Sequence, residues 1–185
     1  APVISPDTDN NTDVLENVAG NAAHDTSVTG QTEQATTFIV RDGERLPFDN
    51  LTGAVEAAQN GDVIELTHDQ VLDKKLVIAG GLKLTLRATS NVTITRSDSF
   101  TTQDGKPAGM ILVEGGSQLT LEGIDNNLLT LHGENKDSNE AIITLRNSST
   151  LTMRKGSVIN QAHCSWKPWG AVYVHSGTFT LDGGE

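Results

Sequence analysis

The feature that most restricts the fold of this sequence is an internal repeat over residues 109–185. Successive copies begin at Met110, Ala141 and Ala171, 31 and 30 residues apart, a spacing typical of solenoid repeats. Each copy opens with a short apolar run, passes a turn rich in Gly, Ser or Asn, and continues into further apolar runs. One such copy cannot bury its apolar side alone, so neighbouring copies are predicted to stack on one another.

Within a copy, apolar and polar residues alternate with the period of a β-strand. Leu119 and Leu121 face one side of the predicted strand, and Thr120 and Glu122 face the other. If each copy forms one coil of three strands and the coils stack in parallel, each coil adds a layer of ~4.8 Å. Equivalent positions then form two inward columns, one of Leu119, Leu151 and Phe179 and one of Leu121, Met153 and Leu181.

The alternative fold is a sandwich or barrel of antiparallel hairpins. Such hairpins favour tight Asn-Gly or Asp-Gly turns between neighbouring strands. Asp-Gly pairs occur at residues 42–43, 104–105 and 182–183, but they are not placed regularly between predicted strands. The pattern therefore favours parallel coils.

At its C-terminal copy the sequence also resembles a known family. Residues 170–185 read GAVYVHSGTFTLDGGE, which is similar to the repeat of right-handed parallel β-helix proteins of the pectin-lyase-like superfamily. The resemblance covers residues 51–185 and is nearest to repeats in surface proteins and adhesins of Gram-positive bacteria. It implies an all-β, right-handed parallel β-helix. It does not select an activity, because that superfamily holds lyases, glycoside hydrolases, phage spikes and adhesins.

Two parts of the chain are predicted from this pattern. Residues 1–37 are polar and lack a sustained period, so they are predicted to be a leader or linker, either disordered or lying along the coil. Residues 38–185 are predicted to be the N-terminal part of a β-helix domain. A short helix at Leu51–Ala58, with Asp49 or Asn50 as its N-cap, is expected to cover the open end of the first coil.

Composition narrows the class of partner. The net charge is −11 and the sequence pI is about 4.7, which argues against nucleic acid, whose partners need a basic face. No apolar run is long enough to span a bilayer, so membrane insertion is not expected. Cys164 is the single cysteine, which precludes an internal disulfide. The charge suits an extracellular protein, although an acidic cytosolic protein would have a similar charge; the resemblance implies a secreted or cell-wall-attached protein. The incomplete last copy also predicts that the β-helix continues beyond Glu185.

The candidate binding site lies in the loops between strands. Aromatic faces can stack on sugar rings, and the chain holds two tryptophans, Trp166 and Trp169. His163 and Lys167 are nearby hydrogen-bonding partners. The alternative is that the tryptophans simply fold their loop onto the coil. Three polar loops are expected to carry functional variation, at residues 97–109, 134–140 and 160–170.

Catalytic and metal chemistry have weaker support in the sequence. Acid–base hydrolysis of a glycan needs carboxylates that converge on one face, but Arg154 stands between Glu122 and Asp182 in the aligned copies, as in an ion-pair column. His163 and Cys164 are adjacent, and nothing obvious orients the imidazole toward the thiol. Residues 125–127 offer oxygen ligands without the spacing of a calcium loop. No catalytic residue, metal ligand or cofactor is therefore predicted.

These observations predict a bacterial surface adhesin or binding module whose loops contact a host protein or a glycan. One alternative is the N-terminal part of a polysaccharide lyase or glycoside hydrolase whose catalytic residues lie downstream. A second alternative is a passive stalk. Exposed tryptophans would favour the binding module, clustered carboxylates the enzyme, and an ordered, patch-free surface the stalk.

Overall fold

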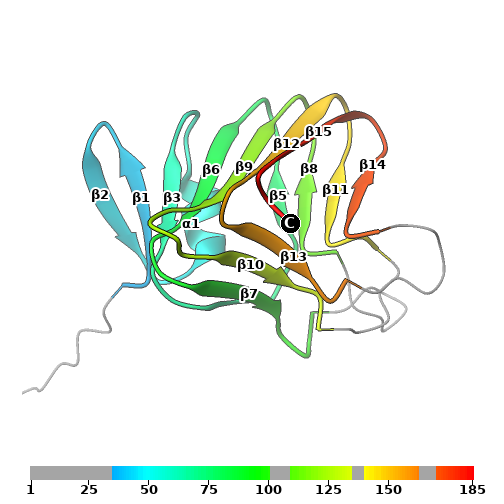
Figure 1. Ribbon diagram of the computed structural model, residues 1–185. Coiled ribbons are helices and arrows are strands. Elements are labelled where there is room, and N and C mark those ends of the chain that lie inside the picture. Colours follow the sequence, from blue (N-terminus) through cyan, green and yellow to red (C-terminus); the bar gives the residue numbers. More distant parts are fainter. Residues whose placement is uncertain (1–34, 101–108, 135–139, 163–169) are drawn as a thin grey trace, which may run out of the picture. The chain divides into compact units, whose positions relative to one another are not determined.

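The computed structural model describes residues 35–100, 109–134, 140–162 and 170–185. This part of the chain is β-rich, with one short helix (Figure 1). The predicted leader, residues 1–37, lies almost wholly outside it. The elements are β1 (Thr37–Arg41), β2 (Glu44–Phe48), α1 (Leu51–Ala57), β3 (Val63–Leu66), β4 (Gln70–Leu72), β5 (Leu76–Ile78), β6 (Lys83–Ala88), β7 (Val92–Arg96), β8 (Ile111–Val113), β9 (Gln118–Gly123), β10 (Leu129–His132), β11 (Ile143–Leu145), β12 (Ser149–Arg154), β13 (Ser157–Asn160), β14 (Val172–Val174) and β15 (Gly177–Asp182).

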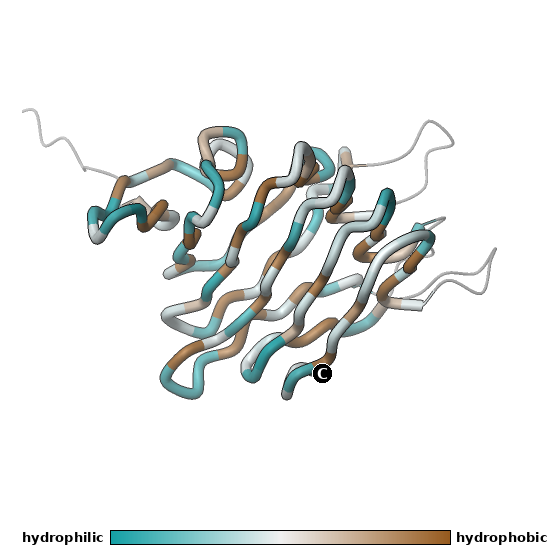
Figure 2. Tube along the Cα trace, turned by 90° about the horizontal axis from the view of Figure 1, so that it is seen from above, coloured by the Kyte–Doolittle hydropathy of each residue, from teal (hydrophilic) through white to brown (hydrophobic). Residues whose placement is uncertain are grey.

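From β3 onward, each strand pairs in parallel with the strand three positions later in the chain. This rule produces three sheets. One sheet has the order β15-β12-β9-β6-β3-β1-β2, and the other two have the orders β13-β10-β7-β4 and β14-β11-β8-β5. Successive turns of the chain lie side by side in Figure 2, with hydrophobic and hydrophilic segments alternating along them. The antiparallel sandwich or barrel is therefore wrong for this part of the molecule.

The predicted inward columns are confirmed by the strand register. Leu119 pairs with Leu151, which pairs in turn with Phe179. Leu121, Met153 and Leu181 align in the same way. The first two members of each column are buried, and their neighbours come from all three sheets in one hydrophobic core. The last members, at the C-terminal strand, are exposed.

Helix α1 forms where the spacing of Leu51, Ala54 and Val55 predicts it, and all three side chains are buried. Of the two cap candidates, Asn50 is the one used: its Oδ1 accepts a hydrogen bond from the Gly53 amide at 2.9 Å. The helix contacts β1 to β5, at the N-terminal side of the three sheets. It ends at Ala57, one residue before the predicted end at Ala58, which is its C-cap.

The N-terminal side also contains a hairpin that the repeat did not predict. Asp42 and Gly43 both adopt positive φ and join β1 to β2, with Arg41 paired to Glu44. Two such residues make the tight turn that matches strand twist. β1 then pairs antiparallel with β3, so the large sheet is mixed at this end and parallel elsewhere.

Candidate functional site

The four predicted ligand-binding residues, His163, Trp166, Lys167 and Trp169, lie outside the described residues. The structure does describe both ends of their segment, Asn160 at the end of β13 and Gly170 just before β14. The attachment of this loop is therefore established, and the role of its tryptophans stays a prediction.

The topology brings the ends of the three predicted loops to one corner of the molecule. Residues 97–109 connect β7 to β8, residues 134–140 lie between β10 and β11, and residues 160–170 lie between β13 and β14. β7, β10 and β13 are neighbours in one sheet, and β8, β11 and β14 are neighbours in another. Three loops that are far apart in the sequence thus start and end beside one another.

Glu140 links residues of three chain segments at this corner. Its Oε2 accepts hydrogen bonds from Lys75 Nζ and from the Gly109 amide, the latter at 2.8 Å. These partners precede β5 and β8, so one carboxylate joins three successive layers. Burial alone would raise the pKa of Glu140, but the hydrogen bonds from Lys75 and Gly109 and the charge of Arg146 hold it below its usual range.

Arg96 provides a second, buried anchor at the same corner. Its Nη2 donates to the carbonyl oxygen of Gly133 at 2.7 Å, and its Nε lies 3.7 Å from a carboxylate oxygen of Glu134. Burial lowers the pKa of Arg96, and Glu134 opposes that shift. Phe100, at the start of the loop that follows β7, is also buried. The loop ends are therefore held by charge as well as by packing.

A groove opens on the outer face of the sheet that contains β5, β8, β11 and β14. Outward positions from consecutive strands form its floor, with Leu112 paired to Thr144 and Thr144 paired to Tyr173. We call it the Tyr173 groove. It has a volume of about 120 Å³ and is lined by Lys75, Leu112, Glu140, Thr144, Arg146 and Tyr173.

The Tyr173 groove combines an aromatic ring with two cations and one carboxylate. Tyr173 is half-buried and Arg146 is exposed, and the Tyr173 ring meets His175 edge-on at 6.3 Å. In a protein of net charge −11, these two cations with one carboxylate form a locally positive site. Such a set can stack against a flat ligand surface and donate hydrogen bonds to oxygen acceptors.

The sequence did not identify this groove. Lys75 and Glu140 are 65 residues apart and become neighbours only through the register of the strands. Tyr173 is the only tyrosine in the chain, and it occupies an outward strand position beside the tryptophan loop. This tyrosine, at an outward position next in sequence to the tryptophan loop, was the one sequence feature that could have indicated the groove.

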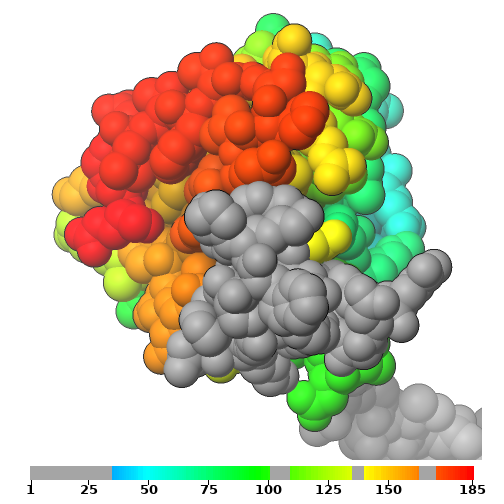
Figure 3. All heavy atoms as spheres, turned by 90° about the vertical axis from the view of Figure 1, so that its right-hand side faces the viewer, coloured from blue at the N-terminus to red at the C-terminus, as the bar shows by residue number. Residues whose placement is uncertain are grey.

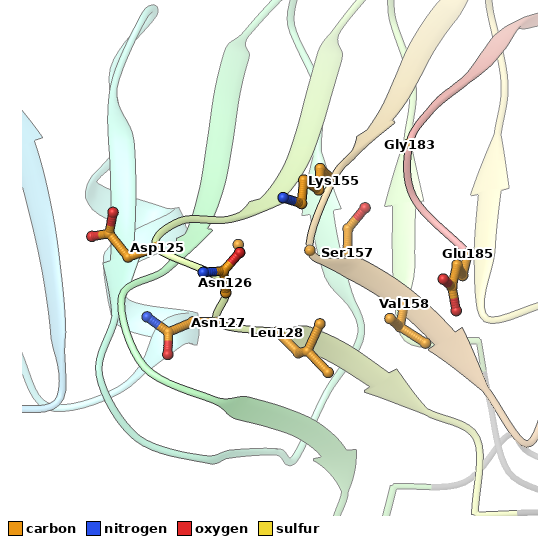
Figure 4. A pocket seen from close by; sticks show the side chains of 11 residues that line it. Asp125, Asn126, Asn127, Leu128, Lys155, Ser157, Val158, Gly183 and Glu185 are labelled. Atoms are coloured by element: carbon orange, nitrogen blue, oxygen red, sulfur yellow. The ribbon is translucent and has the colours of Figure 1, made fainter.

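A larger pocket of about 530 Å³ lies at the turns between β9 and β10 and between β12 and β13. Lys155, Ser157 and Glu185 line it together with residues 125–128 (Figure 4). Figure 4 shows the Asp125 carboxylate pointing away from Lys155. Three glycines, Gly123, Gly156 and Gly183, also line it. Its lining contains no aromatic side chain, in contrast to that of the Tyr173 groove.

Residues 125–127, whose oxygen atoms the sequence analysis noted, all line this pocket. Asn127 Nδ2 donates to the carbonyl oxygen of Thr89, just after β6, at 3.0 Å. Glu122 is occupied by two arginines. The carboxylate of Asp69, which lies between β3 and β4, accepts a hydrogen bond from the Thr93 amide at 2.7 Å. Among the described residues, no group of three or more His, Cys, Asp or Glu is placed to hold a metal ion.

The carboxylates on the large sheet form an ion-pair column, as the aligned copies suggested. Glu122 accepts from Arg87 at 2.8 Å and from Arg154 at 3.1 Å. Asp182 is in register with Arg154, and Glu65 lies 3.9 Å from Arg87. We call the series Glu65, Arg87, Glu122, Arg154 and Asp182 the charge column.

The lowered pKa of Glu122 in the charge column argues against a role for this residue as a general acid. Burial would raise the pKa of Glu122, but the hydrogen bonds from Arg87 and Arg154 outweigh it and keep that pKa low. A general acid for glycoside hydrolysis needs a raised pKa. Asp62 is likewise structural: it is buried and pairs with Arg41 at 2.7 Å.

Comparison with protein-family models, with curated proteins and with solved structures yields no match to this chain. Among the described residues, no helix has both the length and the apolar character needed to cross a membrane. The function must therefore be argued from the site itself.

Proposed function

We propose that this chain is part of a right-handed parallel β-helix of the pectin-lyase-like kind and serves as an extracellular binding module of a bacterial surface protein. Three parallel sheets with a constant three-strand repeat support the fold. The resemblance of residues 170–185 to surface-protein repeats supports the location. The ligand is a glycan, presented by a host cell or by a neighbouring cell.

The observation that carries this proposal is the Tyr173 groove beside the ends of the three loops. Tyr173 supplies an aromatic face, and Arg146 and Lys75 supply donors for sugar hydroxyl and ring oxygens. Glu140 supplies an acceptor and also fixes Lys75 in place. Because the tryptophan loop returns to the sheet at Gly170, just before Val172, we propose that Trp166 and Trp169 extend the same binding surface.

A passive stalk is the second candidate. The charge column and the outward threonines paired across β9, β12 and β15 give the large sheet a regular polar surface. Such a surface suits a rigid spacer that projects another domain. In this alternative the Tyr173 groove binds nothing.

A glycan-array screen of the intact chain distinguishes the two. Tyr173→Ala and Arg146→Ala are compared with Lys83→Ala, which removes an exposed cation from the large sheet and serves as the control. Loss of one stacking ring or one charged donor costs about tenfold in affinity, equivalent to ~1.4 kcal/mol. We expect both groove variants to lose binding by that factor and the control to keep it.

Variants of the loop extend the test. Trp166→Ala and Trp169→Ala are screened on the same array, with folding checked by circular dichroism. Loss of binding in these variants and in Tyr173→Ala would support one continuous surface. An array on which the unmodified chain binds nothing would refute the binding module and favour the stalk.

A further inference from the structure

The lining of the Tyr173 groove extends along the strand direction, with one cation at each end. Lys75 directly precedes β5, and Arg146 directly follows β11. Leu76 and Ile143 are both aligned with the same residue of β8. Arg146 therefore lies ~13 Å further along the strands than Lys75, at ~3.3 Å per residue. The ring of Tyr173 comes from a strand position between these two levels.

The cation at the Lys75 end is already paired. Glu140 Oε2 accepts a hydrogen bond from Lys75 Nζ, and the two opposite charges offset each other. Each side chain remains 31% exposed. A ligand hydroxyl group can therefore still accept a hydrogen bond from the ammonium group or donate one to the carboxylate. This end of the groove suits neutral polar groups better than a further charge.

The cation at the Arg146 end has no such partner. Arg146 is exposed, and its guanidinium makes no hydrogen bond or ion pair with the other residues that the structure describes. A guanidinium holds five N–H donors in a rigid plane and matches the two oxygens of a carboxylate through parallel hydrogen bonds. Arg146 therefore offers a complete and unused site for one carboxylate.

The charge of the groove limits the ligand to a single negative charge. Lys75 and Arg146 are positive and Glu140 is negative, so one positive charge is in excess. The charge of Arg146 reaches Glu140, because it helps to lower the pKa of that carboxyl group. A phosphate monoester carries about −1.5 to −2 at pH 7, so it would exceed the charge of Arg146 and be repelled by Glu140. A carboxylate balances the groove.

The size and position of the groove favour the end of a glycan chain. Its volume of about 120 Å³ equals that of about four waters at ~30 Å³ each, so one sugar residue fills it. Figure 3 shows β11 (yellow) and β14 (orange-red), which supply part of the floor, side by side at the surface. A further strand beside β14 would lengthen this face without covering it, because outward side chains point away from the plane of the sheet.

We propose that the Tyr173 groove is specific for a terminal sugar residue that carries one carboxylate. This inference rests on the proposed binding of a glycan and names the chemical class of its ligand. Arg146 binds the carboxylate through two parallel hydrogen bonds, and Tyr173 packs against a face of the sugar ring. The paired Lys75 and Glu140 bind hydroxyl groups at the other end.

Two trisaccharides serve as probes, N-acetylneuraminic acid linked to lactose and glucuronic acid linked to lactose. They place the carboxylate at different positions on the ring, so they distinguish two sources of the same group. Each is compared with its methyl ester, which keeps the ring and removes the charge, and with lactose. Isothermal titration calorimetry on the intact chain measures the affinities. We expect at least one acid to bind about tenfold more tightly than its ester, as for a charge-assisted hydrogen-bonded pair.

Variants of Arg146 separate its shape from its charge. Arg146→Lys keeps the charge but loses the planar fork, so the preference for acid over ester should fall to about threefold. Arg146→Ala should abolish the preference. Lys83→Ala, which removes an exposed cation from the large sheet, is the control and should retain it in full.

The limits on charge and on chain length are tested separately. Glu140→Gln keeps a side-chain oxygen for Lys75 and Gly109 but removes the negative charge, so this variant should bind phosphorylated lactose, which the unmodified chain rejects. The preferred acid, extended by a galactose beyond its carboxylated residue, should bind the unmodified chain more weakly than the acid itself. Circular dichroism verifies that the Arg146 and Glu140 variants fold.

The outcomes distinguish this inference from the proposed function. Equal binding of acids and esters, or of the acid and its extended form, would overturn the inference and leave glycan binding intact. Acetylalanine that binds as tightly as the trisaccharides would also overturn it, because the sugar ring would then contribute nothing. No binding by any probe or by any glycan on the array would overturn both.

Discussion

Removing the same side-chain atoms from two positions of one inward column should have very different costs. Leu121 is 0% exposed and pairs with Leu86 on one side and Met153 on the other. Leu181 is 57% exposed and pairs with Met153 alone. The substitutions Leu121→Ala and Leu181→Ala delete identical groups, so the difference between them reports only the layer that covers each one.

The magnitudes follow from burial. A fully buried Leu→Ala change costs ~3 kcal/mol, because transfer free energy is lost and a cavity remains. At Leu181 a large part of the side chain already contacts water and no closed cavity forms, so we expect a cost below ~1 kcal/mol. With a urea dependence of ~2 kcal/mol per molar, the unfolding midpoint falls by ~1.5 M for Leu121→Ala and by less than ~0.5 M for Leu181→Ala.

The assay is urea unfolding followed by circular dichroism at low protein concentration. Leu128→Ala, at a position 46% exposed, is the control and should resemble Leu181→Ala. Equal and large losses at Leu121 and Leu181 would refute the reasoning, since they would mean that the Leu181 side chain is covered in solution. A small loss at Leu121 would refute the column itself.

Two further predictions concern charge. Glu122→Gln removes the negative charge that pairs with both Arg87 and Arg154. It should lower the free energy of unfolding by ~1–2 kcal/mol, measured by thermal or urea unfolding. Glu114 makes no ion pair among the described residues, so the control Glu114→Gln should change stability little. The pKa values of Asp62, Glu122 and Glu140 are all lowered in the folded state. These three carboxylates therefore stabilise the folded state fully above the ordinary carboxyl pKa of ~4. The stabilisation is lost as the pH falls through their pKa values in the folded state. Unfolding midpoints measured from pH 7 to pH 3 should therefore decline.

The variant Asp62→Asn tests the source of that decline. Arg41 lowers the pKa of Asp62 by hydrogen bonding, and the Gln59 amide adds to the effect. The variant should be less stable at pH 7 and should show a shallower loss toward pH 3. A decline as steep as that of the unmodified chain would mean that other carboxylates carry the pH dependence. If high salt does not reduce the stabilisation by the ion pairs of the charge column, these pairs are more shielded from solvent than their exposure indicates.

Within residues 109–185, sequence periodicity was sufficient to predict the strands and their pairing in the large sheet. The spacing of about 30 residues placed Leu119 against Leu151 and Leu121 against Met153, and both pairings are confirmed. The helical spacing at Leu51 was confirmed in the same way. These features are local, because alternation within a strand and repetition along the chain are both readable in a single sequence.

The site depended on information that periodicity does not contain. The Tyr173 groove requires Lys75, Glu140 and Tyr173 to meet on one outer face. Polar outward positions have no common composition, so nothing in the repeat marks which of them become neighbours. The predicted tryptophan site lies in a loop outside the described residues, and loop residues do not follow the strand period that made the rest of the chain predictable.

By itself, therefore, the sequence determined which side chains of the repeat point inward and which strands of successive copies pair in parallel. Only the tertiary structure decided that β1 and β2 turn antiparallel at one end, because a two-residue Asp-Gly turn depends on the twist of the strands it joins. Only the tertiary structure placed Glu140 across three layers and left Phe179 and Leu181 exposed. A periodic pattern states that a residue faces the core, whereas burial depends on whether another layer is there to cover it.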